Sequence, residues 1–195
     1  MKVMRSLLRA PWRFAVRVGV RLRALRLRLR FLGRRVKVGR GSWVDASSRL
    51  EATLGGSIAI GERCEIHPLS MILAYGGAVR IGDDCSINPF TLLYGHGGLT
   101  IGDRVRIAAH VVIIPANHNP AGEHIGLTES GVTMRGIHIG DDVWIGAGAR
   151  ILDGVHIGSR AIVGAGSVVT RSIESGATVA GVPARPLKSQ RESQQ

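Results

Sequence analysis

Residues 137–170 read IHIGDDVWIGAGARILDGVHIGSRAIVGAGSVVT, with an aliphatic residue at every sixth position from Ile139 and Gly often following it. The same spacing extends back to Ile60. An amphipathic helix needs a period of about 3.6, and a β-meander shows turn signals roughly every 8–12 residues, so neither explains the pattern. Hexapeptide repeats are typical of parallel β-helices. The anchor positions are Ile60, Ile66, Ile72, Ile81, Ile87, Leu93, Ile101, Ile107, Ile113, Ile139, Ile145, Ile151, Ile157, Val163 and Val169.

Three hexapeptides make one triangular coil, so extra residues between the triplets can be counted. The gaps after Ile72 and Leu93 hold three and two extra residues, whereas the gap between Ile113 and Ile139 holds 20. Insertions in solenoids form loops, and loops this long in compact folds are often functional. A weaker coil at 38–50 brings the expected total to about six coils over 38–187, with a polar C-terminal tail at 188–195.

The composition predicts one domain with an aliphatic core, because 45% of the 195 residues are hydrophobic but only 4% are aromatic. Cys64 and Cys85 each lie four residues after an anchor. We expect them to be small core residues stacked in successive coils. Two cysteines make neither a disulfide framework nor a zinc site, which favours a reducing compartment.

Positions 1–40 carry 14 of the 26 Lys and Arg residues and no acid, so 12 basic and 14 acidic residues remain for the body. Arginines four apart, from Arg5 to Arg21, alternate with Leu, Val, Phe and Trp. This pattern predicts a basic amphipathic helix over 1–37. Its uncharged runs are too short for a transmembrane span or a signal peptide. We expect it to bind an anionic membrane surface. Nucleic acid is a weaker rival because the body is nearly neutral, and a helix that is simply solvated or packed on a protein partner is the third possibility.

The run IGDDVWIGAGARILDGVHIGSRAIVGAGSVVTRSI, with VAGVPAR after it, resembles the hexapeptide-repeat acyltransferases. The nearest relatives in this resemblance are the galactoside and maltose O-acetyltransferases and the O-acetyltransferases of surface polysaccharide synthesis. It covers about 58–187 and leaves 1–37 outside. The resemblance implies a left-handed parallel β-helix and a homotrimer with sites between neighbouring prisms. It also implies acetyl-CoA as co-substrate, no permanently bound cofactor, and a glycan acceptor. With the basic segment, it predicts a cytoplasmic enzyme on the inner face of the cytoplasmic membrane.

The resemblance also assigns site residues. The family's catalytic histidine lies at the start of the long loop, thirteen positions after the Val of IG-D-x-V; that Val is Val105 here, and the matching position is His118. An acceptor-binding Asn seven positions after Ile81 is Asn88. His96 and His124 are further candidates for acceptor binding. The positions that match the family's donor contacts are Trp144, Ala147, Gly148, Ala165, Gly166 and Thr170, with Arg171 and Arg185 for the nucleotide phosphates; Ala147 stands where a hydroxyl residue is frequent.

His118 suits base catalysis, because a neutral imidazole can take the proton of a hydroxyl that attacks a thioester in a ternary complex. The alternative is a loop histidine that merely bonds a neighbouring carbonyl. N-acetylation of an amino sugar would use the same base. A zinc enzyme of the γ-carbonic anhydrase type would use His96, His118 and His124, but their spacings of 22 and six depart from that family's pattern. A non-catalytic β-helical scaffold is the remaining possibility.

Overall fold

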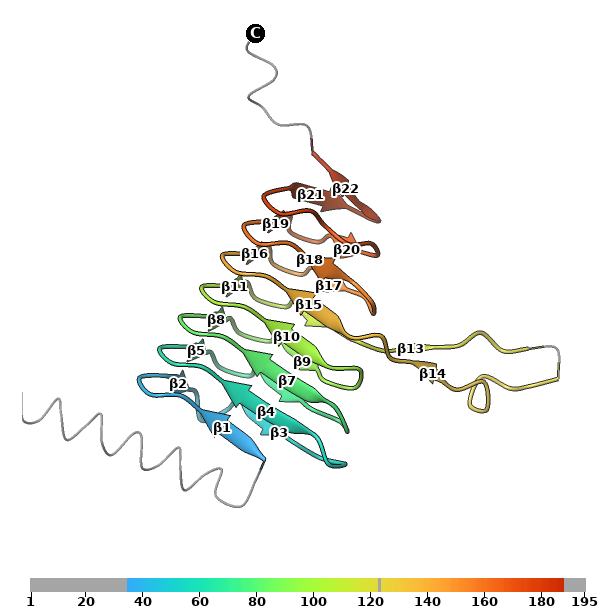
Figure 1. Ribbon diagram of the computed structural model, residues 1–195, viewed down its shortest axis with the longest axis horizontal. Helices are drawn as coiled ribbons and strands as arrows, with labels where there is room; N and C mark the ends of the chain where they lie inside the picture. The colour runs from blue at the N-terminus through green and yellow to red at the C-terminus, as the bar shows by residue number, and fades with distance from the viewer. Residues whose placement is uncertain (1–34, 123, 188–195) are drawn as a thin grey trace, which may run out of the picture. The chain divides into compact units, whose positions relative to one another are not determined.

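The computed structural model describes residues 35–122 and 124–187, which wind into a left-handed parallel β-helix of triangular cross-section (Figure 1). Three sheets form its faces, and their strands run parallel except for the last strand of face 2, which pairs antiparallel. Face 1 contains β1 (Val36–Val38), β4 (Ser57–Ile60), β7 (Ala78–Ile81), β10 (Leu99–Ile101), β15 (Ile137–Ile139) and β18 (His156–Ile157). Face 2 contains β2 (Trp43–Val44), β5 (Glu65–Ile66), β8 (Ser86–Ile87), β11 (Arg106–Ile107), β16 (Trp144–Ile145), β19 (Ile162–Val163), β21 (Thr178–Gly181) and β22 (Ala184–Pro186). Face 3 contains β3 (Arg49–Glu51), β6 (Met71–Leu73), β9 (Leu92–Tyr94), β12 (Val112–Ile113), β17 (Arg150–Ile151) and β20 (Val168–Val169).

The six-residue spacing is confirmed by the strand register. On face 2, for example, Ile107 pairs with Ile87 below it and Ile145 above it, and the other two faces follow the same rule. Each of the fifteen anchors is at most 4% exposed. The stacked anchor side chains of the three faces therefore form one continuous aliphatic core along the prism axis.

The described prism begins two positions earlier than the sequence predicted. Val36 pairs with Ile58 and is only 7% exposed, so Val36 and Lys37 belong to β1 and not to a helix. Pairing with β4 outweighs the local basic pattern here. The rest of the predicted helix, residues 1–34, and the tail 188–195 lie outside the described residues. Within the described part, we find no helical segment with the length and apolarity of a bilayer span.

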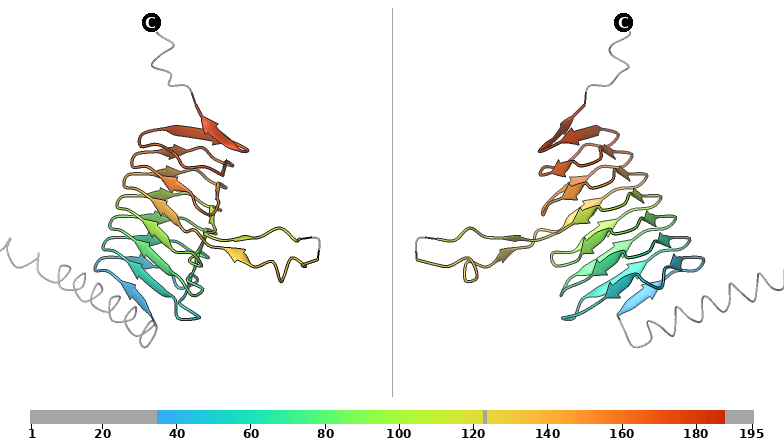
Figure 2. Two further views of the ribbon diagram at one scale, coloured as in Figure 1. Left: turned by 45° about the vertical axis from the view of Figure 1, so that its right-hand side comes forward. Right: turned by 180° about the vertical axis from the view of Figure 1, so that it is seen from behind.

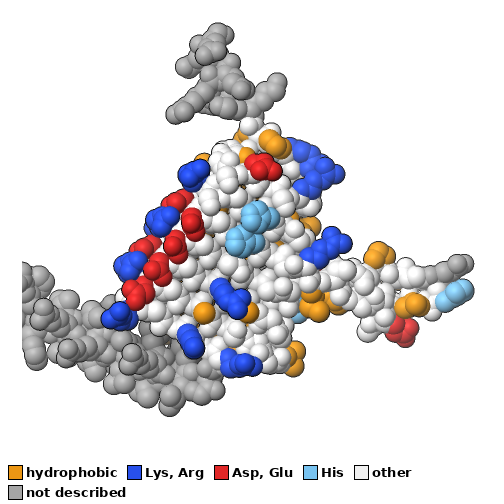
Figure 3. Space-filling model, viewed as in Figure 1, with side chains coloured by type: hydrophobic (Ala, Val, Ile, Leu, Met, Phe, Trp, Pro, Cys, Tyr) orange, Lys and Arg blue, Asp and Glu red, His pale blue; other side chains and the backbone are white. Residues whose placement is uncertain are grey.

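The corner between faces 1 and 2, the first corner, carries side chains of alternating charge, visible along one edge of Figure 3. Arg63 pairs with Asp84 at 2.7 Å, and Arg104 pairs with Asp142 at 2.7 Å. Hydrogen bonds from these guanidinium groups hold the pKa of each of the two carboxyls below its usual range. One coil is thus tied to the next on the solvent side as well as in the core.

Cys64 and Cys85 lie in the core at successive coils, as predicted, with exposures of 0% and 1%. Each thiol donates to a carbonyl of the next coil, Gly82 and Gly102 respectively, at 3.1 Å. A hydrogen bond with Cys64 and then burial raise the pKa of the Cys85 thiol. The Cys85 thiol is therefore a packing group rather than a nucleophile.

The extra residues of the described coils fall at one corner, the third, where face 3 leads back to face 1. They occupy 52–56, 74–77 and 95–98, and the long insertion occupies 114–136 in the same column. The corner between faces 2 and 3, the second corner, keeps its regular length in every coil. This asymmetry places all loop variation on one edge of the prism.

Candidate active site

The long insertion forms an arm that projects from the third corner (Figures 1 and 2). Its base is an antiparallel pair, β13 (Asn117–His118) and β14 (Val132–Thr133), in which His118 lies opposite Val132. Beyond it, Asn119 Nδ2 donates to Ser130 O at 2.8 Å, and Ser130 Oγ donates to Asn119 O at 2.8 Å. The arm is thus a hydrogen-bonded hairpin over its first half.

Both roots of the arm are fixed by neighbouring coils. On the outgoing side, the buried Pro115 accepts a hydrogen bond from Gly97 N at 3.1 Å. On the returning side, the Asp153 carboxylate accepts bonds from Arg135 N and Gly136 N at 2.9 and 3.0 Å. A Cβ at Gly97 would lie 2.7 Å from Pro115 O and 2.9 Å from Gly136 N, so only glycine permits this approach. The arm's position is set by the prism, not by the arm alone.

The three predicted loop histidines occupy different parts of this corner. His118 is exposed on β13, three positions beyond the buried Pro115, and His124 is exposed further out on the arm. His96 lies at the prism corner below the arm, with its ring centroid 5.1 Å from that of Tyr75 and 5.3 Å from that of Tyr94. Among the described residues, no three His, Cys, Asp or Glu side chains are gathered to hold a metal ion.

The predicted donor and acceptor residues separate into two groups. At the second corner, Asn88 donates its amide to Ile107 O at 2.8 Å, so it also links two coils. The same corner carries the small residues Ala147, Gly148, Ala165 and Gly166, and Trp144 is 54% exposed on the adjoining face 2. Thr170 and Arg171 lie at the third corner, above the arm. One chain therefore places Asn88 and His118 at opposite edges of face 3.

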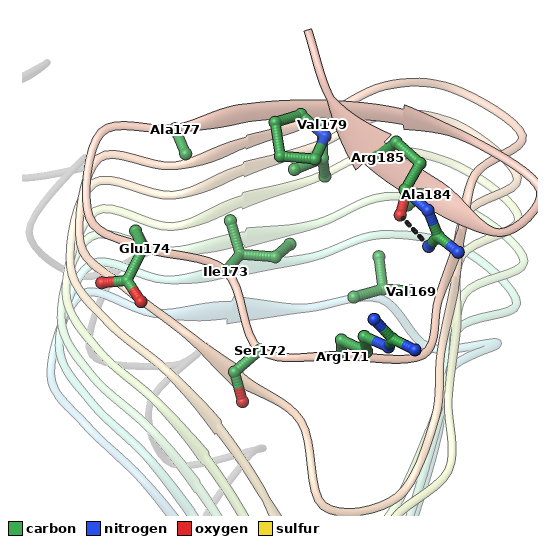
Figure 4. A pocket seen from close by; sticks show the side chains of 10 residues that line it. Val169, Arg171, Ser172, Ile173, Glu174, Ala177, Val179, Ala184 and Arg185 are labelled. Atoms are coloured by element: carbon green, nitrogen blue, oxygen red, sulfur yellow. Dashed lines mark hydrogen bonds between the residues drawn. The ribbon is translucent and has the colours of Figure 1, made fainter.

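Arg171 and Arg185 meet at a pocket of about 210 Å³ at the C-terminal end of the prism. Its apolar lining includes Val169, Ile173 and Val179 from the last turns of the coil. Figure 4 shows both arginines on the same side of this pocket. Two exposed guanidinium groups beside an apolar cavity suit a ligand that joins phosphate groups to an apolar or planar moiety.

Two features of this corner were missing from the sequence interpretation. The first is the Asp153 clamp on the returning strand, because Asp153 sits in a coil without insertions. The second is the contact of both tyrosines of the chain with His96. One hint of these two contacts was present in the sequence: Asp153, both tyrosines and His96 all follow an anchor residue of face 3.

The repeat itself is decisive for the class of fold. Residues 136–171 match the bacterial transferase hexapeptide (six repeats) family. Within this stretch the chain matches the hexapeptide repeat that the family model describes. Nodulation protein L of Rhizobium meliloti (strain 1021) is 49% identical over 89 residues, which are 45% of this chain and 46% of that protein. The chain spans about half the length of the curated relatives it matches.

Solved hexapeptide-repeat structures cover more of the chain. A mutant of AntD, an N-acyltransferase from Bacillus cereus in complex with dTDP-4-amino-4,6-dideoxyglucose and coenzyme A, has a TM-score of 0.71 at 25% identity. The match covers 86% of this chain and 92% of that one. A hexapeptide-repeat acetyltransferase from Vibrio cholerae has a TM-score of 0.56 at 28% identity, over 78% and 73% of the two chains. Both proteins share the coiled prism with this chain.

Proposed function

We propose that this protein is an acetyl-CoA-dependent O-acetyltransferase that acts on a hydroxyl of a sugar or surface glycoconjugate. The observation that carries the proposal is the exposed imidazole of His118 on an arm whose two roots are fixed by the neighbouring coils. A general base must be held in place and remain accessible, and His118 meets both conditions. The similarity to the hexapeptide-repeat acetyltransferase from Vibrio cholerae supports the same reaction.

In the proposed reaction His118 removes the proton of the acceptor hydroxyl while that oxygen attacks the thioester carbonyl. The C–S bond then breaks, and coenzyme A leaves as the thiol after its sulfur takes the proton held by His118. The backbone N–H of Ala147 supplies an oxyanion donor, since Ala147 has no hydroxyl and the N–H of Gly148 already donates to Ala109 O at 2.9 Å. No covalent enzyme intermediate is needed. Arg171 and Arg185 bind the phosphates of coenzyme A beside the C-terminal pocket.

Acceptor binding is assigned to Asn88, His96 and His124. Because Asn88 and His118 lie at opposite edges of face 3, we propose that the site forms between two copies of the chain in a homotrimer. One copy would supply its arm and third corner, and the next would supply its second corner with Asn88 and the small residues. Residues 1–34 would hold the trimer at an anionic membrane surface, on the cytoplasmic side.

N-acetylation of an amino sugar is the second candidate. AntD, which covers most of this chain's length, is an N-acyltransferase solved with an amino sugar nucleotide. A base placed like His118 can take a proton from an amine as well as from a hydroxyl.

The test is release of free thiol from acetyl-CoA by the purified full chain, with a panel of glycans and amino sugars as acceptors. Mass spectrometry of the products, before and after mild alkali, separates base-labile esters from stable amides. We expect an ester. An amide would favour the second candidate, and thiol release independent of every acceptor would refute acyl transfer to sugars.

A further inference from the structure

Three aromatic rings gather at the third corner immediately below the arm. Tyr75 follows β6, Tyr94 ends β9, and His96 lies two positions later in the short insertion of that coil. The ring centroids of Tyr75 and Tyr94 are 5.5 Å apart, and each lies within 5.3 Å of the His96 ring. These are the only two tyrosines of the chain, so all of its tyrosine is concentrated at this one place.

The cluster is not part of the hydrophobic core. In the described part of the chain, every fully buried hydrophobic residue is aliphatic or a cysteine, whereas Tyr75 and Tyr94 are half-buried. Aromatic rings that stay partly open to solvent have ring faces and polar atoms available to a ligand. The cluster therefore calls for an explanation other than core packing.

The backbone around the rings is built for close approach. Gly77 lies directly under Gly95, with no room for a side chain between them, and a Cβ at Gly95 would lie 2.9 Å from the Ala74 Cα. With small residues beneath them, the rings define the surface of this corner. Gly97, the next residue after His96, bonds to Pro115 at the root of the arm. The cluster is thus coupled through the backbone to the strand that carries His118.

The surroundings of His96 decide which of its ring nitrogens can serve a ligand. Its Nδ1 atom is buried and has no hydrogen-bond partner among the described residues. An unpartnered buried N–H donor is costly, so the neutral ring is best protonated at Nε2. In that tautomer, Nε2 can donate to a ligand hydroxyl.

We propose that Tyr75, Tyr94 and His96 form a stacking platform for a pyranose ring of the acceptor; this inference rests on the proposed function and narrows its substrate class. A pyranose presents C–H groups on its faces and hydroxyls at its edge. The tyrosine rings offer electron-rich faces to the C–H groups, and their hydroxyls and His96 offer hydrogen bonds to the edge. A sugar bound here lies beside the root of the arm that carries His118, because Gly97 N donates to Pro115 O there.

The first test is a direct binding experiment that does not depend on activity. The full chain is labelled with 3-fluorotyrosine, and its two fluorine signals are assigned by Tyr75→Phe and Tyr94→Phe. Methyl glycosides of glucose, galactose, mannose and N-acetylglucosamine are then titrated to tens of millimolar, with glucitol as the acyclic control. We expect both signals to move with at least one glycoside and not with glucitol. No movement with any of the four, or equal movement with glucitol, overturns the platform.

The second test uses Tyr75→Leu and Tyr94→Leu, with Trp43→Leu as the matched control. Trp43 is 38% exposed and packs edge-on against the His67 ring at 5.4 Å, but it lies on β2 in the first coil, outside the proposed site. Each tyrosine change should raise the acceptor KM about tenfold, equivalent to about 1.4 kcal/mol, while coenzyme A binding stays unchanged. The Phe replacements should keep most of the affinity. Acceptor KM values that match the Trp43→Leu control overturn the proposal.

The two proposals fail in different ways. If no acceptor supports thiol release but glycosides still move the tyrosine signals, the acyl transfer is refuted and the platform stands as a sugar-binding site. If thiol release is normal and neither leucine variant changes the acceptor KM, the platform is refuted and the enzyme activity stands.

Discussion

At the scale of single residues, His118 differs from the other histidines in where the chain holds it. The regular coils carry histidines on their outer faces, such as the stacked pair His138 and His156 at 4.8 Å. His118 instead lies just outside the prism, close to a buried proline and on a two-residue strand that limits its backbone. This placement combines a fixed Cα with an open imidazole.

His118→Ala should therefore lower kcat by about 10²–10⁴, the range for loss of a positioned general base, with little change in coenzyme A affinity. Thiol release measures the first quantity and isothermal titration measures the second. His156→Ala, also exposed but on β18 of face 1 and outside the proposed site, is the control and should leave kcat nearly unchanged. Turnover at the wild-type rate in His118→Ala would rule out the mechanism.

Asn88 has two roles to separate, because its amide bonds to the next coil whether or not it also contacts the acceptor. Asn88→Ala should lower the free energy of unfolding by about 1 kcal/mol and raise the acceptor KM. Thr91→Ala is the matched control, since Thr91 Oγ1 donates to Ala108 O at 3.0 Å in the same corner. We expect the two variants to lose similar amounts of stability, and only Asn88→Ala to change the acceptor KM. If Asn88→Ala and Thr91→Ala have the same acceptor KM, the sugar binds away from Asn88.

At the scale of elements, the arm depends on bonds made by the coils below and above it. Asp153→Ala leaves Arg135 N and Gly136 N without their acceptor, so the returning strand should loosen. We expect kcat to fall several-fold, with coenzyme A affinity retained, and the amides of residues 132–136 to exchange faster with deuterium. Hydrogen exchange read by mass spectrometry follows this directly.

The control for the clamp is Asp141→Ala. Its carboxylate also accepts a backbone N–H from a neighbouring coil, Asp103 N at 2.8 Å, but at the first corner. Asp141→Ala should lower the free energy of unfolding without changing amide hydrogen exchange in the arm. Equal exchange in the arms of wild type and Asp153→Ala would mean that Pro115 and Gly97 alone hold the arm.

The hexapeptide spacing predicts the elements of the prism well and those of the arm poorly. Each anchor such as Ile107 meets two others in register, so the period alone determines faces, core and the place of the insertion. The arm has no such period. Tyr75 and Tyr94 belong to successive coils but follow their anchors, Ile72 and Leu93, at different distances, and they meet only through the irregular path of the third corner. A six-residue repeat has no information about contacts within that corner.

At the scale of the whole molecule, the two corners that carry the proposed site face different neighbours. Light scattering of the full chain should give three times its mass of 20.8 kDa. Mixing His118→Ala with Asn88→Ala chains should restore part of the activity, because some mixed interfaces would contain both intact residues. A fully active monomer, or no recovery on mixing, would contradict a site formed between copies.

The basic segment gives the last prediction. The full chain should sediment at low salt with vesicles that contain anionic lipid. Each basic residue near the headgroups should contribute about 1 kcal/mol of binding free energy. The three copies in a trimer should bind the same vesicle together and so bind more tightly than one copy. A chain that starts at Arg35 should not sediment. It must keep Val36–Val38, because these residues form β1. Equal binding by both chains, or no binding by the full chain, would exclude residues 1–34 as an anchor.

The number of coils between the arm and the C-terminal arginines has a consequence for the donor. The arm leaves before β15, and Arg171 follows β20, so two coils without insertions, each rising about 4.8 Å, separate them. If acetyl-CoA binds as proposed, this part of the prism acts as a molecular ruler from thioester to phosphates. Every coil added or removed there would change the matching donor length in steps of one strand spacing, while the aliphatic core continued unbroken. The number of repeats would then determine which acyl donor fits, and no pocket residue would need to change.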